Sequence, residues 1–329
     1  MRGGGTMNAR CELCPRRCLI RPGQSGDCHI RVNIDGKLTA VTYGFPCAMH
    51  VDPVEKKPLY HFLPGSTAFS IATAGCTLHC RNCQNWEISQ ATPDKVEAYE
   101  VSPAKLAELA ISYHCQSIAY TYSDPAAYYE YALDGCHAAH KKGLRNILVT
   151  AAYINREPFR ELCRISDAAN IDLKGITDKF YREVCGGTLR PVQEALVIAR
   201  ECGVWLEITN LVIPSLNDSE RDLRELSRWV RANLGADTPL HFSRFYPRYR
   251  MRNLPSTSDT TLRLARDIAK AEGLHHVYVG NLLNQEWSAT YCVQCGKKLI
   301  SRTGFHIEEN HLVDGKCPQC QTQTAGVWK

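Results

Sequence analysis

Three cysteines at a fixed short spacing constrain this chain of 329 residues more than any other feature. They lie in Cys76-Thr-Leu-His-Cys80-Arg-Asn-Cys83, directly after the apolar run from Ala68 to Thr73. Iron–sulfur clusters are normally held by four cysteines, so a site with three thiolates leaves one iron free to bind and activate a further molecule. A zinc site completed by His79 or by a distant ligand is the alternative that these cysteines leave open.

The spacing Cys-x3-Cys-x2-Cys in a loop after a first strand resembles the radical S-adenosylmethionine (SAM) superfamily. This resemblance implies that Cys76, Cys80 and Cys83 hold a [4Fe–4S] cluster whose free iron is chelated by the amino and carboxylate groups of SAM. It also implies that one electron cleaves SAM into methionine and a 5′-deoxyadenosyl radical, which abstracts hydrogen from a substrate. A reductant such as ferredoxin or flavodoxin is the expected electron donor.

Composition sets the class of protein. The 44% of hydrophobic and 22% of charged residues are ordinary globular values, which excludes disordered and fibrous chains. The net charge of +5 comes without concentrated Lys/Arg blocks, so nucleic acid is not the expected partner.

The sequence contains no apolar run of the ~18 to 20 residues that span a bilayer and no secretory h-region at its start. We therefore expect a cytoplasmic protein, whose 17 cysteines serve largely as metal ligands in a reducing compartment.

Apolar runs alternate with helix-like segments in the middle of the chain, which predicts βα units and a parallel sheet. Ser102-Pro103 and Ser219 are typical of helix N-termini. The runs recur at roughly the spacing of a (β/α)8 barrel of about 250 residues, but they are too few to close one. We predict an α/β fold with an incomplete (β/α)6-type TIM barrel; a doubly wound sheet would want a glycine-rich dinucleotide turn, and none is visible. The expected strands cover residues 68–73, 117–121, 146–150, 168–172, 205–211, 239–245 and 277–280.

Polar residues follow several of these runs, at the strand ends where barrel enzymes carry their sites. Each alone has a structural explanation, because polar residues commonly end strands and cap the next helix. Their repetition around one rim favours a cofactor and substrate site. The set comprises Asp124, Thr150 and Asp172, which we expect to orient SAM, and Lys174, His241 and Arg244, which we expect to face the substrate.

Two further segments resemble the pyruvate formate-lyase activating enzymes. They are Cys80-Arg-Asn-Cys83-Gln-Asn85-Trp86 and Asn170-Ile-Asp172-Leu-Lys174. The resemblance implies that Asn85 lies in the SAM site and that Asp172 and Lys174 lie near the SAM carboxylate and a bound peptide. Asn82, which stands where many members carry an aromatic residue, is included among the expected cofactor contacts. Asp124 stands where the family signature usually ends in glutamate.

A longer match resembles the radical SAM member of the AmmeMemoRadiSam system. It is carried by the segment from Asp52 to Gly65 and by Cys83-Gln-Asn-Trp-Glu-Ile-Ser-Gln90, and it extends from about Cys11 to the C-terminus. The resemblance to the activating enzymes implies a protein or peptide substrate, and the resemblance to this system implies partnership with Amme-type and Memo-type proteins. Lys57 and His61 could reach the site from the segment 52–65, although a surface connector is the safer interpretation.

The remaining cysteine groups predict two more metal centres. Cys292, Cys295, Cys317 and Cys320 form paired Cys-x2-Cys knuckles, which predicts a zinc-ribbon-like module, with an auxiliary iron–sulfur cluster as the alternative. Cys11, Cys14, Cys18 and Cys28 are expected to hold either zinc or a second [4Fe–4S] cluster. Isolated cysteines such as Cys185 are assigned no role. We thus expect a Cys-rich N-terminal segment over 1–64, the barrel over 65–285 and the zinc-ribbon-like module over 286–329.

Two other functions remain open at this point. One is a zinc-dependent nucleic-acid-binding protein in which all three cysteine groups are structural, and its binding would weaken steeply with salt. The other is a radical SAM enzyme that modifies RNA. Neither the substrate nor the oligomeric state follows from the sequence.

Overall fold

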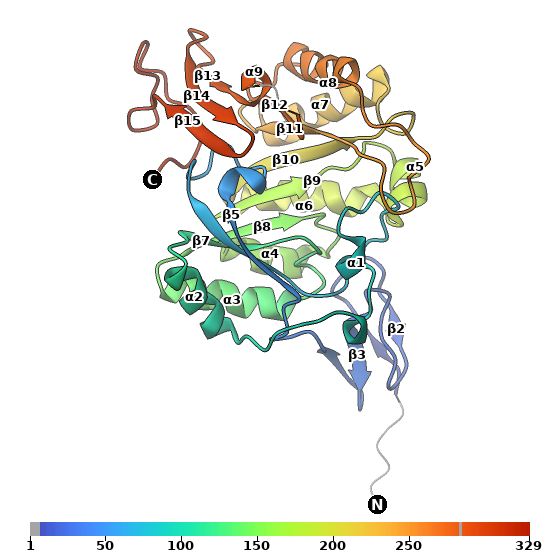
Figure 1. Cartoon of the computed structure of the whole chain (residues 1–329). Coiled ribbons are helices and arrows are strands. Elements are labelled where there is room, and N and C mark those ends of the chain that lie inside the picture. The colour runs from blue at the N-terminus through green and yellow to red at the C-terminus, as the bar shows by residue number, and fades with distance from the viewer. Residues whose placement is uncertain (1–6, 283–284) are drawn as a thin grey trace, which may run out of the picture.

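The centre of the protein is an eight-stranded sheet in the order β12-β11-β10-β9-β8-β7-β6-β5 (Figure 1). The computed structural model describes residues 7–282 and 285–329. Strands β6 to β12 are parallel to one another, whereas β5 runs antiparallel to its neighbour β6. The strands are β5 (Ala48–Pro53), β6 (Thr67–Ala72), β7 (Ser117–Tyr120), β8 (Arg145–Thr150), β9 (Ala168–Asp172), β10 (Trp205–Val212), β11 (Leu240–Arg244) and β12 (Val277–Gly280).

The seven apolar runs of the sequence are the seven parallel strands, so the predicted parallel α/β sheet is confirmed. Strand β5 was not predicted, because its residues include an exposed Val51 and a charged Asp52 instead of a continuous apolar run. It pairs along the whole length of β6, from Ala48 opposite Ala72 to Pro53 opposite Thr67. Polar residues and a proline suit an edge strand, because they discourage further pairing.

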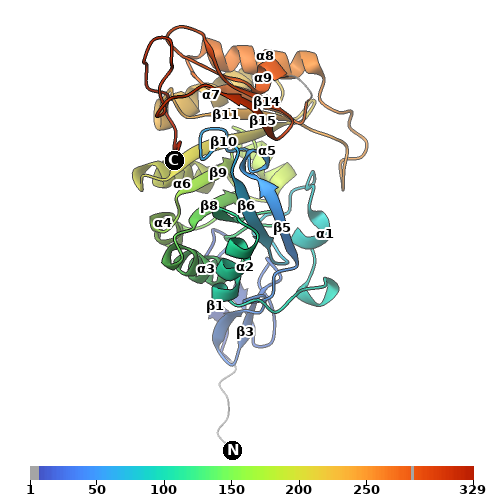
Figure 2. The ribbon, with the colours of Figure 1, turned by 60° about the vertical axis from the view of Figure 1, so that its left-hand side comes forward.

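The longer helices form one layer against the sheet. Contacts join helices that follow one another along the chain, α2 with α3, α4 with α6, α6 with α7 and α7 with α8. Figure 2 shows α3, α4 and α6 on one side of the sheet and α1 on the other. Helices on one face of an open parallel sheet produce a partial barrel, whereas a doubly wound sheet carries helices on both faces. The helices are α1 (Trp86–Ser89), α2 (Pro103–Ser112), α3 (Tyr129–Lys141), α4 (Arg156–Arg164), α5 (Asp178–Phe180), α6 (Leu189–Glu201), α7 (Glu220–Leu234), α8 (Asp259–Ala271) and α9 (Gln285–Ser288).

Both predicted helix starts are confirmed. The Ser102 side chain accepts a hydrogen bond from the backbone N–H of Lys105 at the start of α2, with Pro103 in the first turn. Ser219 accepts one from the backbone N–H of Asp222 at the start of α7. Each cap satisfies a backbone donor that has no partner within the helix, a contribution of typically ~1 kcal/mol.

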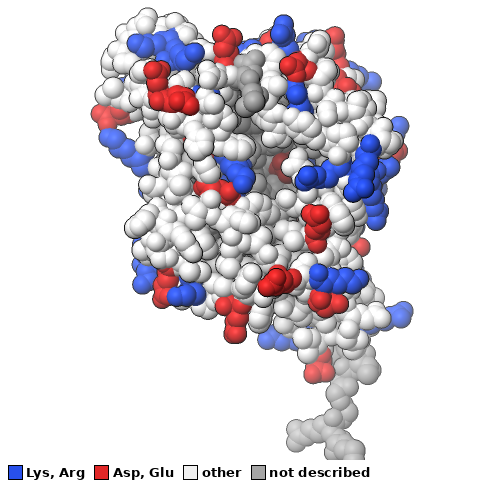
Figure 3. All heavy atoms as spheres, viewed as in Figure 1, with Lys and Arg blue, Asp and Glu red and all other residues white. Residues whose placement is uncertain are grey.

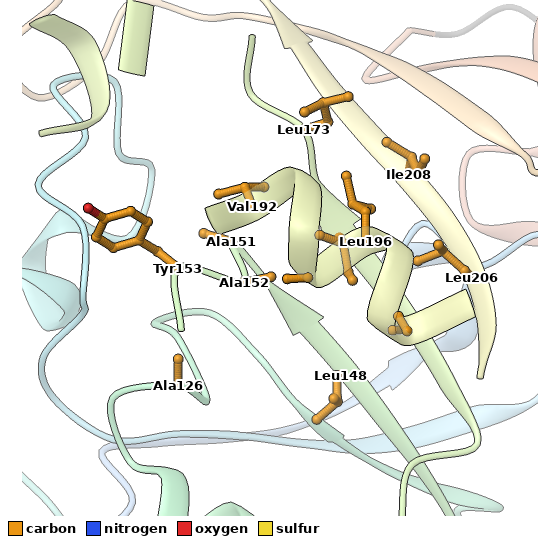
Figure 4. Close-up of a cluster of buried hydrophobic side chains, with 14 of the residues drawn as sticks. Ala126, Leu148, Ala151, Ala152, Tyr153, Leu173, Val192, Leu196, Leu206 and Ile208 are labelled. Atoms are coloured by element: carbon orange, nitrogen blue, oxygen red, sulfur yellow. The ribbon is translucent and has the colours of Figure 1, made fainter. Parts of the chain in front are cut away.

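The core between the helical layer and the sheet is apolar. Figure 4 shows Val192 and Leu196 of α6 with Leu206 and Ile208 of β10, all four of them buried. In a strand, alternate residues face the same side, so 206 and 208 face the helices while 205, 207 and 209 face the interior of the partial barrel. Burial of each such leucine or isoleucine stabilises the fold by roughly 1.5–3 kcal/mol.

Two small modules flank the sheet. The N-terminal one contains the hairpins β1 (Ala9–Arg10) with β2 (Leu19–Ile20) and β3 (Arg31–Ile34) with β4 (Lys37–Ala40). The C-terminal one is the antiparallel sheet of β13 (Thr290–Tyr291), β14 (Lys298–Thr303) and β15 (His306–Asn310). The boundaries expected at residues 64 and 285 stay predictions.

Residues 1–6, where the sequence predicts no secretory signal, lie outside the described part of the chain. Among the described residues, no helix combines the length and the apolar character that crossing a membrane requires.

Gly135 of α3 packs closely against the sheet, and it offers a test of this packing. A Cβ at this position would lie 2.6 Å from the hydroxyl oxygen of Tyr120 on β7. Alanine normally favours a helix over glycine by ~1 kcal/mol, but here we expect Gly135→Ala to lower the free energy of unfolding by about 1–3 kcal/mol through overpacking.

Chemical denaturation of four proteins measures this effect: wild type, Gly135→Ala, Tyr120→Phe and the double variant. In the Tyr120→Phe background the closest atom is removed, so the cost of Gly135→Ala should shrink. An alanine that stabilises the wild-type background would contradict the packing described.

Candidate active site

A cavity of about 410 Å³ opens at the carboxyl ends of the parallel strands. Each of the seven strands contributes a residue at or just after its end, as the polar strand ends predicted. A volume of this size lies within the ~300–1,000 Å³ of small-molecule sites. The contributions are Cys76 after β6, Asp124 after β7, Thr150 of β8, Asp172 of β9, Ile213 after β10, Ser243 of β11 and Gly280 of β12.

Cys76, Cys80 and Cys83 all line this cavity from the loop between β6 and α1. The backbone N–H of Leu78 donates to the Cys76 thiol at 3.4 Å, and Ser89 Oγ lies 3.2 Å from the Cys83 sulfur. Burial raises the pKa of the Cys76 and Cys83 thiols. Ligation of a metal requires thiolates, so any metal bound here displaces these protons.

Cys80 differs from the other two because Cys185 lies behind it. A hydrogen bond with the Cys185 thiol lowers the pKa of Cys80, burial opposes this, and the charge of Lys174 lowers the pKa further. Cys185 ends the π-helix Tyr181–Cys185, and its carbonyl accepts from the backbone N–H of His79. Cys185 was assigned no role from the sequence, and the structure places it against the central loop rather than in an unrelated part of the core.

His79 lies between two of the three cysteines but is already engaged. Its Nδ1 bonds the side-chain oxygen of Gln90 at 2.6 Å, and its Nε2 bonds the carboxylate of Asp27, also at 2.6 Å. The Asp27 hydrogen bond raises the pKa of His79. Both ring nitrogens are therefore used by the protein, which argues against the zinc site completed by His79.

Asp124 and Thr150 form a closed hydrogen-bonded unit beside the thiols. The buried Asp124 carboxylate accepts from the backbone N–H groups of Ala126 at 2.9 Å and Ala151 at 3.0 Å, and from Thr150 Oγ1 at 2.8 Å. Burial raises the pKa of Asp124, and these hydrogen bonds oppose the rise. The carboxylate fixes the turn after β8 in place, so it positions the cavity wall.

Asp172 and Lys174 form an ion pair in the cavity wall, with 2.7 Å between Lys174 Nζ and Asp172 Oδ2. Burial would lower the pKa of Lys174, but the charges of Asp172 and Cys80 raise it well above its usual range. Lys174 therefore carries a positive charge beside the Cys80 sulfur. A cation there favours the thiolate form of a neighbouring cysteine.

The two predicted asparagines also line the cavity. Asn85 donates from Nδ2 to the carbonyl oxygen of Tyr122 at 2.8 Å, which ties the end of the cysteine loop to the end of β7. Asn82 Oδ1 is buried and has no hydrogen-bond partner. A buried acceptor without a partner costs about 1–3 kcal/mol, so Asn82 is a site where a bound molecule would supply the missing donor.

His241 and Arg244 are not brought together. His241 lines the cavity and donates from Nε2 to Glu207 at 2.7 Å, whereas Arg244 pairs with Asp259 at the start of α8 and is not among the described residues that line the cavity. Successive residues of a strand point to opposite faces, so His241 and Arg244, three apart on β11, cannot face the same cavity. The substrate role expected for Arg244 has no support in this geometry.

Glu207 is a central residue that sequence reasoning missed. Its fully buried carboxylate accepts from four donors: the backbone N–H groups of Tyr60 at 3.0 Å and His61 at 2.7 Å, Trp205 Nε1 at 3.0 Å, and His241. Burial alone would raise the pKa of Glu207, but the hydrogen bond and charge of His241 with the other donors bring it to about 2. Glu207 thus holds the segment 54–63, which we call the connector, inside the partial barrel.

Lys57 shows that the connector is not a surface segment. Its side chain is only 2% exposed and lines the cavity, so the sequence-based interpretation of this segment as a surface connector was wrong. Lys57 Nζ lies 2.6 Å from Asp52 Oδ2 and 4.4 Å from the ring centroid of Tyr122. Burial lowers the pKa of Lys57 to about 8, against the opposing effect of Asp52.

His61 does not line the cavity; it joins the connector to the C-terminal module. It is fully buried, its Nδ1 donates to the carbonyl oxygen of Ala325 at 2.7 Å, and its Nε2 accepts from the hydroxyl of Tyr278 at 2.5 Å. Arg302, from β14, stacks 4.2 Å above the ring of Tyr60 and donates to the Tyr60 carbonyl at 2.8 Å. The C-terminal module is therefore fastened to the cavity wall.

The C-terminal cysteines form a compact four-thiol cluster. The sulfurs of Cys292 and Cys320 are 3.5 Å apart, those of Cys295 and Cys317 are 3.7 Å apart, and all four lie within 4.8 Å of one another. Tetrahedral ligation at a metal–sulfur distance of ~2.3 Å sets neighbouring sulfurs ~3.8 Å apart. The predicted four-cysteine grouping is confirmed, and its spacing suits one ion. Phe305, in the turn between β14 and β15, carries this module to the rim of the cavity.

Comparisons with known proteins agree with this arrangement. Residues 70–227 match the family model described as Radical SAM superfamily. An uncharacterized protein of Methanocaldococcus jannaschii is 46% identical over 312 residues, which cover 95% of this chain and 92% of that protein. The pyruvate formate-lyase-activating enzyme of Clostridium pasteurianum is 23% identical over 159 residues, 48% of this chain and 66% of the enzyme.

Among solved structures, Streptococcus suis SuiB bound to the precursor peptide SuiA aligns with a TM-score of 0.51 at 15% identity. The alignment covers 69% of this chain and 51% of SuiB. At this level of identity the likeness is one of fold.

Substitution of Glu207 tests its role in holding the connector. Because its pKa is depressed to about 2 in the folded protein, Glu207 contributes stability that is fully present above the ordinary pKa and is lost as the pH falls toward 2. In Glu207→Gln, some of these donors face an amide N–H₂ group that cannot accept a hydrogen bond. We therefore expect the free energy of unfolding to fall by about 2–4 kcal/mol at pH 7.

Urea unfolding of the wild type and of Glu207→Gln from pH 7 to pH 3 measures both the loss of stability at pH 7 and the dependence of stability on pH. The wild type should lose stability below about pH 4.5 more steeply than Glu207→Gln, because the variant lacks the titrating group. Equal slopes for the two proteins would show that Glu207 is not the anchoring charge.

Proposed function

Because residues 70–227 match the radical SAM superfamily model, we propose that the chain cleaves SAM reductively and uses the product to abstract hydrogen from a protein or peptide. The observation that carries the proposal is the convergence of three thiols and the ends of all seven parallel strands on one cavity. One cavity would then hold both the cofactor and the hydrogen atom that is removed.

The residues present fit a [4Fe–4S] cluster with SAM. Cys76, Cys80 and Cys83 would hold the cluster, and the unpartnered Oδ1 of Asn82 offers an acceptor to a bound molecule. When bound, the cluster supplies the electron that splits SAM into methionine and a 5′-deoxyadenosyl radical, which takes a hydrogen atom from the substrate. The protein's share is placement and the exclusion of water.

Within the cavity we assign different tasks to the charged and the neutral groups. Asp124 acts through Thr150 and Ala151, whose positions it fixes, while Asp172 and Asn85 are placed to orient SAM. Lys174 keeps a cation next to Cys80.

On the side of the cavity formed by the connector, we add a substrate role for Lys57 beside the predicted role of His241. Both residues line the cavity and both are held by carboxylates, Lys57 by Asp52 and His241 by Glu207. Their side chains are therefore fixed before substrate enters, which reduces the entropy lost on binding.

A protein or peptide substrate is supported by the relationship to an activating enzyme and by the fold shared with a protein solved with a peptide bound. We propose that Amme-type and Memo-type proteins are partners, that the electron donor is a ferredoxin or flavodoxin, and that the C-terminal cysteines hold zinc. On the face shown in Figure 3, acidic and basic side chains are interspersed over most of the surface, and basic side chains gather at its right-hand edge.

Cys80→Ala tests the proposed chemistry. We expect the anaerobically reconstituted variant to lose the irons of the central cluster and to form no 5′-deoxyadenosine from SAM under dithionite, because a ligand of the cluster is gone. Cys163→Ala is the matched control, since Cys163 is a buried cysteine of α4 that does not line the cavity.

Iron analysis and chromatography of 5′-deoxyadenosine give the readouts. SAM cleavage that persists in Cys80→Ala at the level of Cys163→Ala would overturn the proposal. A near-wild-type circular dichroism spectrum would show that loss of cleavage does not reflect an unfolded barrel.

Cys295→Ala tests the C-terminal metal. Four thiolates at these distances repel one another without a cation, so we expect the wild type to carry about one zinc at this site and the variant to lose it together with the fold of the module. Val293→Ala, an exposed residue of the same turn, is the control.

Zinc analysis and limited proteolysis after residue 285 follow the outcome. The module should become protease-sensitive in Cys295→Ala and stay resistant in Val293→Ala. Iron in place of zinc at this site, or full resistance of the zinc-free variant, would contradict the prediction.

A further inference from the structure

We infer that Cys11, Cys14, Cys18 and Cys28 hold a second [4Fe–4S] cluster, docked against the loop that carries the first. The site goes beyond the proposed function, and only its role as an electron route rests on that function. Cys11 and Cys14 are buried, and Cys18 and Cys28 are partly exposed. A cluster placed there is shielded by protein and still reachable from outside.

Two facing turns bring the four thiols together. The backbone N–H of Cys11 donates to the carbonyl of Cys18 at 2.9 Å, which closes the turn that also carries Cys14. Cys28 lies on the second turn, which is closed by the bond from the N–H of Gly26 to the carbonyl of Arg31. Gly26 packs against the first turn, where a Cβ would lie 3.6 Å from the Cys18 sulfur. Cys14 lies within electrostatic range of the other three thiols, and Cys11 lies within that range of Cys18 and Cys28.

The spacing of these thiols differs from that of the C-terminal set. Among residues 7–282 and 285–329, only the C-terminal thiols have three or more sulfurs within 4.8 Å of one another. The N-terminal thiols are more widely spaced, as are the three central thiols of the proposed radical SAM site. One zinc ion draws its sulfurs to ~3.8 Å, whereas a cubane with one thiolate on each iron holds them farther apart. The geometry therefore favours a cluster over zinc.

The buried side chain of Arg31 is a second, independent indication of an iron–sulfur cluster at the N-terminal thiols. Its side chain is 5% exposed, and its two terminal nitrogens are used in a bidentate pair with Glu130 at 2.8 and 2.7 Å. Its Nε is buried without a partner, and its charge lies close to Cys11 and Cys28. Hydrogen bonds to the sulfurs help to set the reduction potential of an iron–sulfur cluster, and a buried N–H beside thiolates can donate such a bond. A bound cluster would in turn give this N–H the acceptor that it lacks.

Direct contacts join this site to the central loop. The Cys28 carbonyl lies so close to Gly75 that a Cβ there would meet it at 2.5 Å. Arg16 donates to the carbonyl of Thr77 at 2.8 Å, and Asp27 bonds His79. Residues 27 and 28 thus lie against the segment that begins the central motif. A cluster here is placed to accept one electron from a ferredoxin- or flavodoxin-type donor and to pass that electron to the central cluster.

The first experiment counts metals in the full chain after anaerobic reconstitution with iron and sulfide. We expect roughly eight irons in the wild type, and roughly four each in the Cys11/Cys14/Cys18→Ser and Cys76/Cys80/Cys83→Ser variants. The central triple variant should keep a [4Fe–4S] Mössbauer signature although it cannot cleave SAM. About four irons in the wild type, or loss of zinc instead of iron from the N-terminal variant, would overturn the inference.

The second experiment uses Arg31 and does not depend on removing ligands. In the Cys76/Cys80/Cys83→Ser background, Arg31→Met should retain four irons but shift the EPR signal and the reduction potential of the remaining cluster. Arg17→Met changes an exposed arginine of the turn that carries Cys14 and Cys18, and it should leave both the EPR signal and the reduction potential unchanged. An unshifted potential in Arg31→Met would refute the assigned hydrogen bond. A wild type with eight irons but no SAM cleavage would defeat the proposed function and leave this site standing.

Discussion

The buried carboxylate of Glu207 is the interaction on which the arrangement of the cavity depends. It lies inside the partial barrel and accepts from two peptide N–H groups, an indole and an imidazole. Desolvation of a carboxylate costs several kcal/mol, which the protein recovers only if every lone pair finds a donor. Glu207 meets that condition, and the donors it recruits include the backbone of the connector. The connector therefore lies within the barrel because a charge there requires its N–H groups.

Once the connector is inside, three parts of the chain share one cavity. Lys57 comes from the connector, the cysteines and strand ends come from the barrel, and Phe305 comes from the C-terminal module. Arg302 and His61 bind the third part to the first. A metal bound by the C-terminal thiols would thus stabilise a module whose hairpin forms part of the cavity rim. The proposed radical chemistry needs such enclosure, because a reactive intermediate must meet its substrate and not water.

The elements predicted well are those with a local physical cause. Apolar runs identified all seven parallel strands, and Ser102 and Ser219 marked helix starts, because burial and capping act over a few residues. Convergence of the strand ends followed from topology alone. Edge strand β5 was missed because exposed residues, His50 and Val51, and a charged Asp52 interrupt its apolar pattern. Lys57 was named as a residue that could reach the site, but its segment was interpreted as a surface connector, because a lysine is buried only where distant groups, here Asp52 and Tyr122, receive it. Arg244 was a different failure, since the two-residue period of β11 already placed it opposite His241.

Thiol spacing separates three cysteine groups that sequence alone treats as alike. Only the C-terminal thiols converge to the distances of a single tetrahedral ion. The central thiols are spread along a loop, and the cation Lys174 lies beside Cys80. The N-terminal thiols are spread over two turns, and the cation Arg31 lies beside Cys11 and Cys28. A thiolate cluster carries negative charge, and a buried cation next to it lowers the cost of placing that charge in the protein. The C-terminal thiols need no such partner if a divalent ion neutralises part of their charge. The two cations therefore support, independently of spacing, the proposal that the N-terminal and central sites bind the same kind of metal centre.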